Sequence, residues 1–135
     1  MLVVMTSQPI APQLFESVPV PHLIGGRHRH TGRVVFPLDT NDDQFEACAL
    51  PSSGTLWSYT VQRFRPKTPP YIGPEEFEPF ALGYVELPGT VIVESRLTDV
   101  PFEQLRIGMP MTLTLIPLLT KADGTQITTY AFRPA

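Results

Sequence analysis

The chain contains 16 prolines in 135 residues, and this feature constrains its fold more than any other. Proline has no backbone N–H donor and fixes φ, so it is excluded from helix interiors and from central strands. The prolines recur along the chain at intervals that leave room for strands but seldom for long helices. The sequence therefore predicts a β-rich fold with rigid connections.

Alternating apolar and polar residues predict a series of strands in the C-terminal part of the chain. In GTLWSYTVQRF, residues 54–64, the side chains of Trp57, Tyr59 and Val61 are expected to share one face. The final strand follows Asp123-Gly124, which is a strong signal for a hairpin turn. The strands predicted after residue 64 are residues 80–87, 90–97, 109–117 and 125–133.

The order of these elements favours a small Greek-key barrel of the OB type. Between the third and fourth predicted strands, residues 99–108 are expected to make a short helical turn closed by Gly108. Five strands with a turn in this place are typical of the OB-fold. Because this turn often plugs the barrel, Leu105 and Ile107 are the expected plug residues. A plain β-sandwich is the alternative, but the chain has too few strands for one.

The N-terminal part contains less regular structure. Residues 1–21 are predicted to form an arm with at most one helical turn, around Gln13–Ser17. Residues 22–37 are expected to form two short strands around a turn at His30–Gly32, and residues 39–46 a polar acidic loop. The arm is expected to lie on the domain or on a partner.

Composition narrows the class of protein. A net charge of −3 does not favour bulk binding of nucleic acid, and the basic residues occur only in two short clusters. With one cysteine, a disulfide framework is excluded, and a reducing compartment fits best. The opening apolar run is too short for a signal peptide or a membrane span. We therefore expect a soluble, cytoplasmic protein.

No catalytic motif is found in the sequence. It has no GxSxG, HExxH, GxGxxG or Walker loop. Cys48 lies in FEACAL, which holds an acid and no base, so its neighbours would not lower the pKa of its thiol. The favoured interpretation of Cys48 is a small, at least half-buried hydrophobic residue.

A basic stretch, GGRHRHTGRVVFP, suggests a metal site but lacks the ligands for one. His28 and His30 are two residues apart, so in a strand they would lie on one face. Zinc usually needs about four ligands, and only the carboxylates of Asp39, Asp42 and Asp43 are available to complete a weak mixed site. A surface hairpin with its basic strand near an acidic loop is the favoured interpretation.

The most distinctive segment is the predicted connection RFRPKTPPYIGPEEFEPF, residues 63–80. It holds five prolines, a basic start, a later run of glutamates and several aromatic residues. Prolines stiffen a loop, so exposed Tyr71 and Phe77 would lose little entropy on binding a partner. The alternative is a loop that folds back and seals the end of the barrel. Both interpretations stay open, and both can hold for different residues.

Several strings in the chain resemble one protein family. GTLWSYTVQRF, PPYIGPEEFEPFALGYVELPG, VIVESRLTD and LRIGMPM, in this order, are similar to the OB-fold half of the acyl-CoA-associated zinc-ribbon/OB-fold proteins, a family formerly catalogued as a domain of unknown function. The resemblance covers roughly residues 22–117. It implies an all-β chain with an N-terminal arm (1–21), a rubredoxin-like ribbon hairpin (22–50) and a five-stranded OB-fold Greek-key barrel (51–135).

The ribbon of this chain departs from the family pattern. GGRHRHTG stands where Gly-Gly-Arg-Cys-x-x-Cys-Gly is typical, so that His28 and Thr31 occupy the cysteine positions. The second knuckle is shortened to DTNDDQ without cysteine, and Cys48 falls too late to replace a ligand. Since structural zinc depends on those ligands, we predict that this ribbon binds no metal. Packing of apolar residues is expected to hold the hairpin instead, namely Leu23, Ile24, Val34, Val35 and Phe36.

The resemblance implies an accessory role without catalytic residues or a bound cofactor. Such proteins are similar to small subunits that pair with thiolase-like enzymes, including the lipid-transfer-type thiolases and aldolases of bacterial steroid side-chain breakdown. The large subunit would supply the catalytic groups, in an expected heterotetramer with acyl-CoA as the substrate of the complex. The residues expected at the partner or channel surface are Tyr71, Ile72, Pro74 and Phe77. The candidates for contacts with CoA phosphates are Arg63, Arg65 and Lys67.

Two other functions are considered for the chain. The first is a free-standing OB-fold module that binds acyl-CoA or nucleic acid. The second is an enzyme in its own right that uses Cys48 or a histidine. The accessory subunit is preferred because the chain lacks a catalytic constellation.

Overall fold

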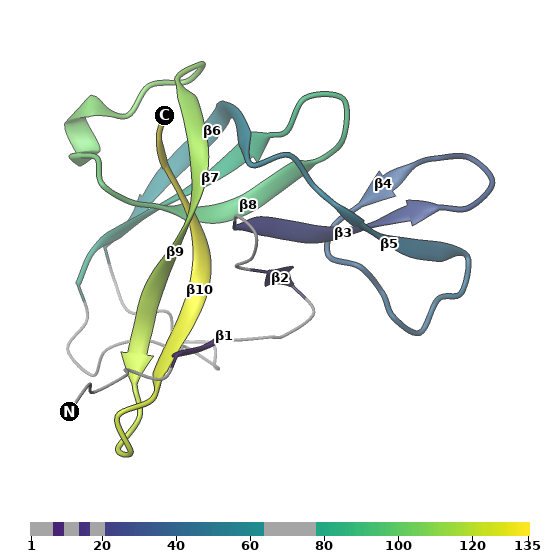
Figure 1. Ribbon diagram of the computed structural model, residues 1–135. Coiled ribbons are helices and arrows are strands. Elements are labelled where there is room, and N and C mark those ends of the chain that lie inside the picture. The colour runs from purple at the N-terminus through teal and green to yellow at the C-terminus, as the bar shows by residue number, and fades with distance from the viewer. Residues whose placement is uncertain (1–6, 10–13, 17–20, 64–77) are drawn as a thin grey trace.

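The computed structural model describes residues 7–9, 14–16, 21–63 and 78–135, and these residues form two β-sheets (Figure 1). In the larger sheet the strand order is β1-β10-β8-β7-β6-β9, and β9 also pairs with β10. The strands from β6 to β10 therefore close into a barrel. This confirms the prediction of an all-β protein with an OB-fold barrel.

The barrel strands lie close to their predicted positions. All neighbouring pairs are antiparallel except β8 and β10, which run parallel, as the Greek-key connection requires. The bounds of these strands are β6 (Ser53–Gln62), β7 (Phe80–Glu86), β8 (Ile92–Leu97), β9 (Pro110–Thr120) and β10 (Gln126–Pro134).

The predicted hairpin turn between β9 and β10 is confirmed. The N–H of Lys121 donates to the carbonyl oxygen of Thr125 at 2.7 Å, and Gly124 adopts φ +89°. The N–H of Thr125 also donates to Asp123 Oδ1 at 2.9 Å. Hydrogen bonds from the backbone and from the side chain of Thr125 lower the pKa of the Asp123 carboxyl group.

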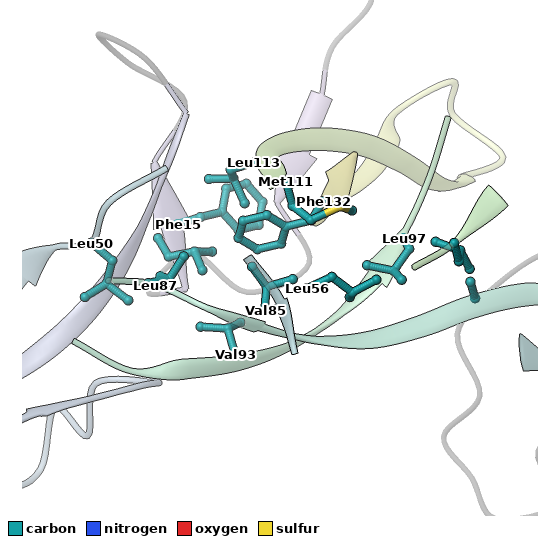
Figure 2. Packing of buried hydrophobic residues seen from close by; sticks show 13 residues of the cluster. Phe15, Leu50, Leu56, Val85, Leu87, Val93, Leu97, Met111, Leu113 and Phe132 are labelled. Atoms are coloured by element: carbon teal, nitrogen blue, oxygen red, sulfur yellow. The ribbon is translucent and has the colours of Figure 1, made fainter. Parts of the chain in front are cut away.

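The core lies inside the barrel and extends to the second sheet (Figure 2). Inward-facing residues of the barrel strands alternate with outward-facing ones, as in the burial of Ala81, Val85 and Val93. The largest fully buried side chains are Phe132, Leu23, Leu56, Leu87, Met111, Val85 and Val93. Because Leu23 comes from the second sheet, the two sheets share one hydrophobic core. The division into a ribbon and an OB-fold domain stays a prediction.

A register shift in β6 changes the direction of one predicted side chain. Leu56 pairs with Val85 and Ser58 with Tyr84, so Trp57 is an additional residue in its strand. Tyr59 and Val61 face the same side of the sheet as buried Leu56, but Trp57 points out. The prediction that Trp57 shares the face of Tyr59 and Val61 is therefore wrong, because a β-bulge breaks the alternation.

The connection between β8 and β9 corrects a second prediction. The helical turn is present as η1 (Phe102–Gln104), but it ends at Leu105 rather than at Gly108. Leu105 is buried, as predicted for a plug residue, whereas Ile107 is 70% exposed. The N–H of Gly108 donates to the carbonyl oxygen of Leu56 at 2.7 Å. This bond fixes the turn at the barrel wall and leaves Ile107 on the outside.

The second sheet, called the ribbon here, consists of β3 (His22–His28) with β4 (Val34–Val35) and β5 (Phe45–Ala49) on its two opposite edges. The short strand β2 (Phe15–Glu16) pairs with the first residues of β3. In Figure 1 the ribbon extends to one side of the barrel. The sequence predicts the turn after β3 but not β5, because the first residues of β5 fall in the predicted acidic loop.

Part of the N-terminal arm pairs with these sheets. The predicted helical turn around residues 13–17 is wrong at Phe15, which is a strand residue paired with Leu23. Its side chain is buried in the common core, and this burial favours the extended strand over a local turn. Ahead of it, β1 (Ser7–Pro9) runs parallel to β10.

Candidate interaction surface

Three large apolar side chains are exposed together on the outer face of β6, β7 and β8. Trp57 is 56% exposed, Tyr84 45% and Ile92 42%. The rings of Trp57 and Tyr84 meet edge to face, with centroids 6.4 Å apart and an interplanar angle of 89°. Single exposed apolar residues are ordinary, but a cluster on adjacent strands is typical of an interaction site.

The register of the strands explains this cluster. Tyr84 in β7 lies between Ser58 of β6 and Glu94 of β8. Glu86, the next outward-facing residue of β7 after Tyr84, pairs with Ile92 of β8. The bulge in β6 turns Trp57 toward this face as well. A strict alternation of two would place Trp57 on the inner face, and for this reason the sequence did not predict the cluster. The irregular spacing of apolar residues around Leu56 is a weak signal for the bulge.

A hollow of about 130 Å³ lies beside Tyr84 on this face. Its outward-facing walls come from all three strands, namely Ser58, Thr60, Leu82, Tyr84 and Glu94. The hydroxyl groups and the carboxylate among these residues can all accept hydrogen bonds. The backbone under Glu94 is fixed, since the Tyr130 hydroxyl donates to its carbonyl oxygen at 3.0 Å.

The charge on this face is mainly negative. Within the described residues, no ion pair is formed by the exposed carboxylates of Glu86 and Glu94. Arg96, on the same face of β8, lies over the ring of Phe80 with its guanidinium carbon 3.9 Å from the ring centroid. The aromatic cluster therefore stands beside two carboxylates that are available to a cation from outside.

Of the residues predicted to bind a partner or CoA, the structure describes only Arg63. It is exposed, and its guanidinium carbon lies 5.8 Å from the centroid of the Phe102 ring. The other predicted site residues lie outside the described part of the chain: Arg65, Lys67, Tyr71, Ile72, Pro74 and Phe77. Their roles stay predictions.

The tip of the ribbon is organised around His28. Its Nδ1 atom accepts hydrogen bonds from the backbone N–H groups of His30 at 3.2 Å and Thr31 at 3.1 Å. Its Nε2 atom lies 3.2 Å from Gln44 Oε1. One tautomer satisfies all of these contacts, with the proton on Nε2 and donated to Gln44. Both ring nitrogens of His28 thus have partners within the chain.

These residues do not fit the zinc site that the ribbon of the family implies. Among the described residues, no three His, Cys, Asp or Glu side chains are grouped as metal ligands. Asp39 and Asp42 accept backbone hydrogen bonds from Asn41 and Gln44 and so stabilise their own turn. Cys48 pairs with Gly25 in the sheet, away from the tip where His28 pairs with Phe45.

Cys48 has the properties of a structural residue. Its side chain is half-buried and packs against the core. Partial burial raises the pKa of the Cys48 thiol, with the Arg27 cation opposing and the Glu46 carboxylate adding to this rise. A raised pKa leaves less thiolate at neutral pH, which does not suit a nucleophile.

The fold and this surface define the chain as an OB-fold protein that presents an exposed aromatic face with acidic neighbours. The family model described as the ChsH2 C-terminal OB-fold domain matches residues 48–115. The chain therefore belongs to this family.

Comparison with solved structures supports the same fold. The chain is similar to a chain of a solved structure described as "Ltp2-ChsH2(DUF35) aldolase", with 20% identity, a TM-score of 0.62 and coverage of 84% of each chain. Comparison with curated proteins gives no match. Within the described residues, the structure has no helix long and apolar enough to cross a membrane.

Proposed function

We propose that this chain is a noncatalytic OB-fold subunit that binds and stabilises a thiolase-like acyl-CoA enzyme, an aldolase or a thiolase, and helps to shape its acyl-CoA channel. The observation that carries the proposal is the membership in the ChsH2 OB-fold family. A chain of similar fold occurs in the solved structure described as an Ltp2-ChsH2 aldolase. Steroid side chains are the proposed substrate class of the complex, and a heterotetramer is its proposed assembly.

The chemistry of the described residues supports a noncatalytic role. Cys48 has a raised pKa, and both nitrogens of the His28 ring are engaged in the ribbon tip. A nucleophile requires an adjacent base or a lowered pKa. In the proposed complex the large subunit supplies these groups, and this chain supplies binding surface.

Two regions of the chain are proposed to have different roles, one at the acyl-CoA channel and one in binding the large subunit. Residues 63–80 carry the aromatic and basic residues for the channel, with Arg63 at the start as a contact for CoA phosphates. The aromatic face around Tyr84 is proposed as a binding surface for the large subunit, since exposed Trp and Tyr side chains are frequent hot spots of interfaces.

Co-expression with a candidate thiolase-like large subunit tests this function. The two chains are expected to elute together in size-exclusion chromatography, and turnover of acyl-CoA is expected only with both present. Separate elution, with turnover that does not respond to this chain, would contradict the proposal.

Calorimetry on the chain without its partner separates the alternative. An accessory subunit is expected to show little heat with acyl-CoA or with a single-stranded oligonucleotide. Strong binding of either ligand by the chain alone would favour a free-standing binding module instead.

A further inference from the structure

We propose that the hollow beside Tyr84 receives an arginine side chain from a partner protein. This inference rests on the proposed function, which makes that partner the thiolase-like large subunit. The exposed cluster of Trp57, Tyr84 and Ile92 would border the point of entry. The size of the hollow, the groups that line it and the charge around it all favour this occupant.

The size of the hollow suits one side chain. Its volume of about 130 Å³ is close to that of a cavity of roughly 150 Å³ that takes up a benzene molecule. A protein loop or a nucleotide requires more room, whereas the head and stem of a single long side chain fit. The hollow is also open on the outer face of the sheet, so a side chain can enter it from a docked surface.

The lining of the hollow suits a planar cation. The carboxylate of Glu94 accepts hydrogen bonds, and so do the hydroxyl oxygens of Ser58 and Thr60. Tyr84, an aromatic residue, also lines the hollow. A guanidinium group stacks on an aromatic ring and pairs with a carboxylate through two parallel hydrogen bonds, which a lysine ammonium does not do.

The charge of the surrounding face selects the class of partner. Glu86 adds a second carboxylate to the same face, and neither it nor Glu94 forms an ion pair within the described residues. Phosphate groups of nucleic acid would be repelled here. Two copies of the chain docked through this face would set the two carboxylates of each copy against a single guanidinium, that of Arg96, which is already stacked on Phe80. A protein surface with an exposed arginine complements both the aromatic rings and the carboxylates.

Glu94→Gln and Trp57→Ala test the inference in the complex with the large subunit. Glu94→Gln keeps the shape of the side chain but removes its charge, and it is expected to weaken binding roughly 30-fold, as for the loss of a desolvated charge pair. Trp57→Ala is expected to weaken binding by a similar factor as a hot-spot truncation. The wild-type dissociation constant is expected to rise with salt, and this dependence should become shallower in Glu94→Gln.

Two matched variants control for general surface effects. Glu103→Gln removes an exposed carboxylate on η1, and Ile107→Ala truncates a large, highly exposed apolar side chain that belongs to the connection between β8 and β9 and not to the strands β6–β8. Both are expected to bind the large subunit within about twofold of wild type, as exposed positions outside an interface do. All variants change exposed side chains, and thermal unfolding checks that they are folded.

The possible results separate the inference from the proposed function. If wild type binds the large subunit and both test variants bind equally well, the inference is wrong but the proposed function stands. If wild type does not bind, the proposed function fails and the inference fails with it. A wild-type dimer that Glu94→Gln or Trp57→Ala dissociates would also overturn the inference, because the occupant would then be a second copy.

Discussion

The barrel and the ribbon are both β-sheets, but different interactions hold them. In the barrel, large side chains such as Phe132, Leu56 and Met111 are fully buried (Figure 2). At the ribbon tip, exposed polar groups carry the structure, as in the hydrogen bond from Arg29 Nε to the carbonyl oxygen of Asp43 at 2.8 Å. The base of the ribbon shares the barrel core through Leu23. The ribbon therefore depends on burial at one end and on hydrogen bonds at the other.

This difference explains how the ribbon forms a sheet in a chain that lacks the cysteines implied by the resemblance. The hydrogen-bond acceptor at the tip is an imidazole nitrogen, Nδ1 of His28, at a position where the resemblance described above implies a cysteine. The second side of the tip is reached through the side chain of Gln44. Of the apolar residues predicted to hold the hairpin, Leu23 is buried in the core and Val34 and Phe36 pack against it.

The largest expected effect is in the barrel. Phe132→Ala removes a fully buried ring and should lower the free energy of unfolding by about 3–5 kcal/mol, because it loses apolar burial and leaves a cavity. Urea unfolding followed by tryptophan fluorescence measures the change. Ile107→Ala is the control and should change stability by less than about 0.5 kcal/mol. A loss below about 1 kcal/mol for Phe132→Ala would mean that the described core is wrong.

A smaller effect is expected at the ribbon tip. His28→Ala leaves two backbone N–H groups without their acceptor and the side-chain oxygen of Gln44 without its donor. The free energy of unfolding should fall by only about 1–2 kcal/mol, because water can reach these groups at the exposed tip. Urea unfolding measures this cost, and hydrogen exchange should locate it in residues 28–33. His30→Ala is the matched control, since in the described contacts its ring only faces that of His28, with centroids 5.8 Å apart. Equal losses in both variants would argue against a specific role of His28.

Tyr130 offers a still smaller effect that depends on pH. Burial raises the pKa of its hydroxyl, and the Glu94 carboxylate adds to this rise. Because the pKa is higher in the folded chain than in the unfolded one, this contribution to stability is complete below about pH 10 and is lost as the pH rises further. Tyr130→Phe should therefore reduce the alkaline loss of stability. It should also cost about 1 kcal/mol at neutral pH through the lost bond to Glu94.

The measurement for Tyr130 is the midpoint of urea unfolding between pH 8 and pH 11. Tyr84→Phe is the control, because Tyr84 is exposed on the barrel surface. If stability falls at alkaline pH by the same amount in wild type and in Tyr130→Phe, a group other than Tyr130 causes the fall.

Much of the fold could be predicted from the sequence, because the barrel follows simple periodicities. Proline and glycine positions marked the connections, and the order of strands and one helical turn identified the OB type. The β-bulge at Trp57 and the exposure of Ile107 could not be predicted, since both depend on contacts with distant residues, such as the bond between Gly108 and Leu56. Strand β5 was missed because its pairing with β3, and not its own composition, makes it a strand.

The candidate site was less accessible to prediction than the fold. Sequence reasoning favoured residues 63–80, whose aromatic and basic residues are conspicuous in one segment. The cluster of Trp57, Tyr84 and Ile92 is spread over three strands, and only the sheet register brings it together. No local pattern contains that information.

The smallest expected effect concerns metal at the ribbon tip. Treatment with EDTA should leave the thermal unfolding midpoint within about 1 °C, because the His28 nitrogens are engaged within the chain and a structural zinc ion would contribute folding energy only through suitable ligands. Elemental analysis of the purified protein checks the same point and should find no stoichiometric zinc. A large drop in the midpoint with EDTA, restored by zinc, would contradict this prediction.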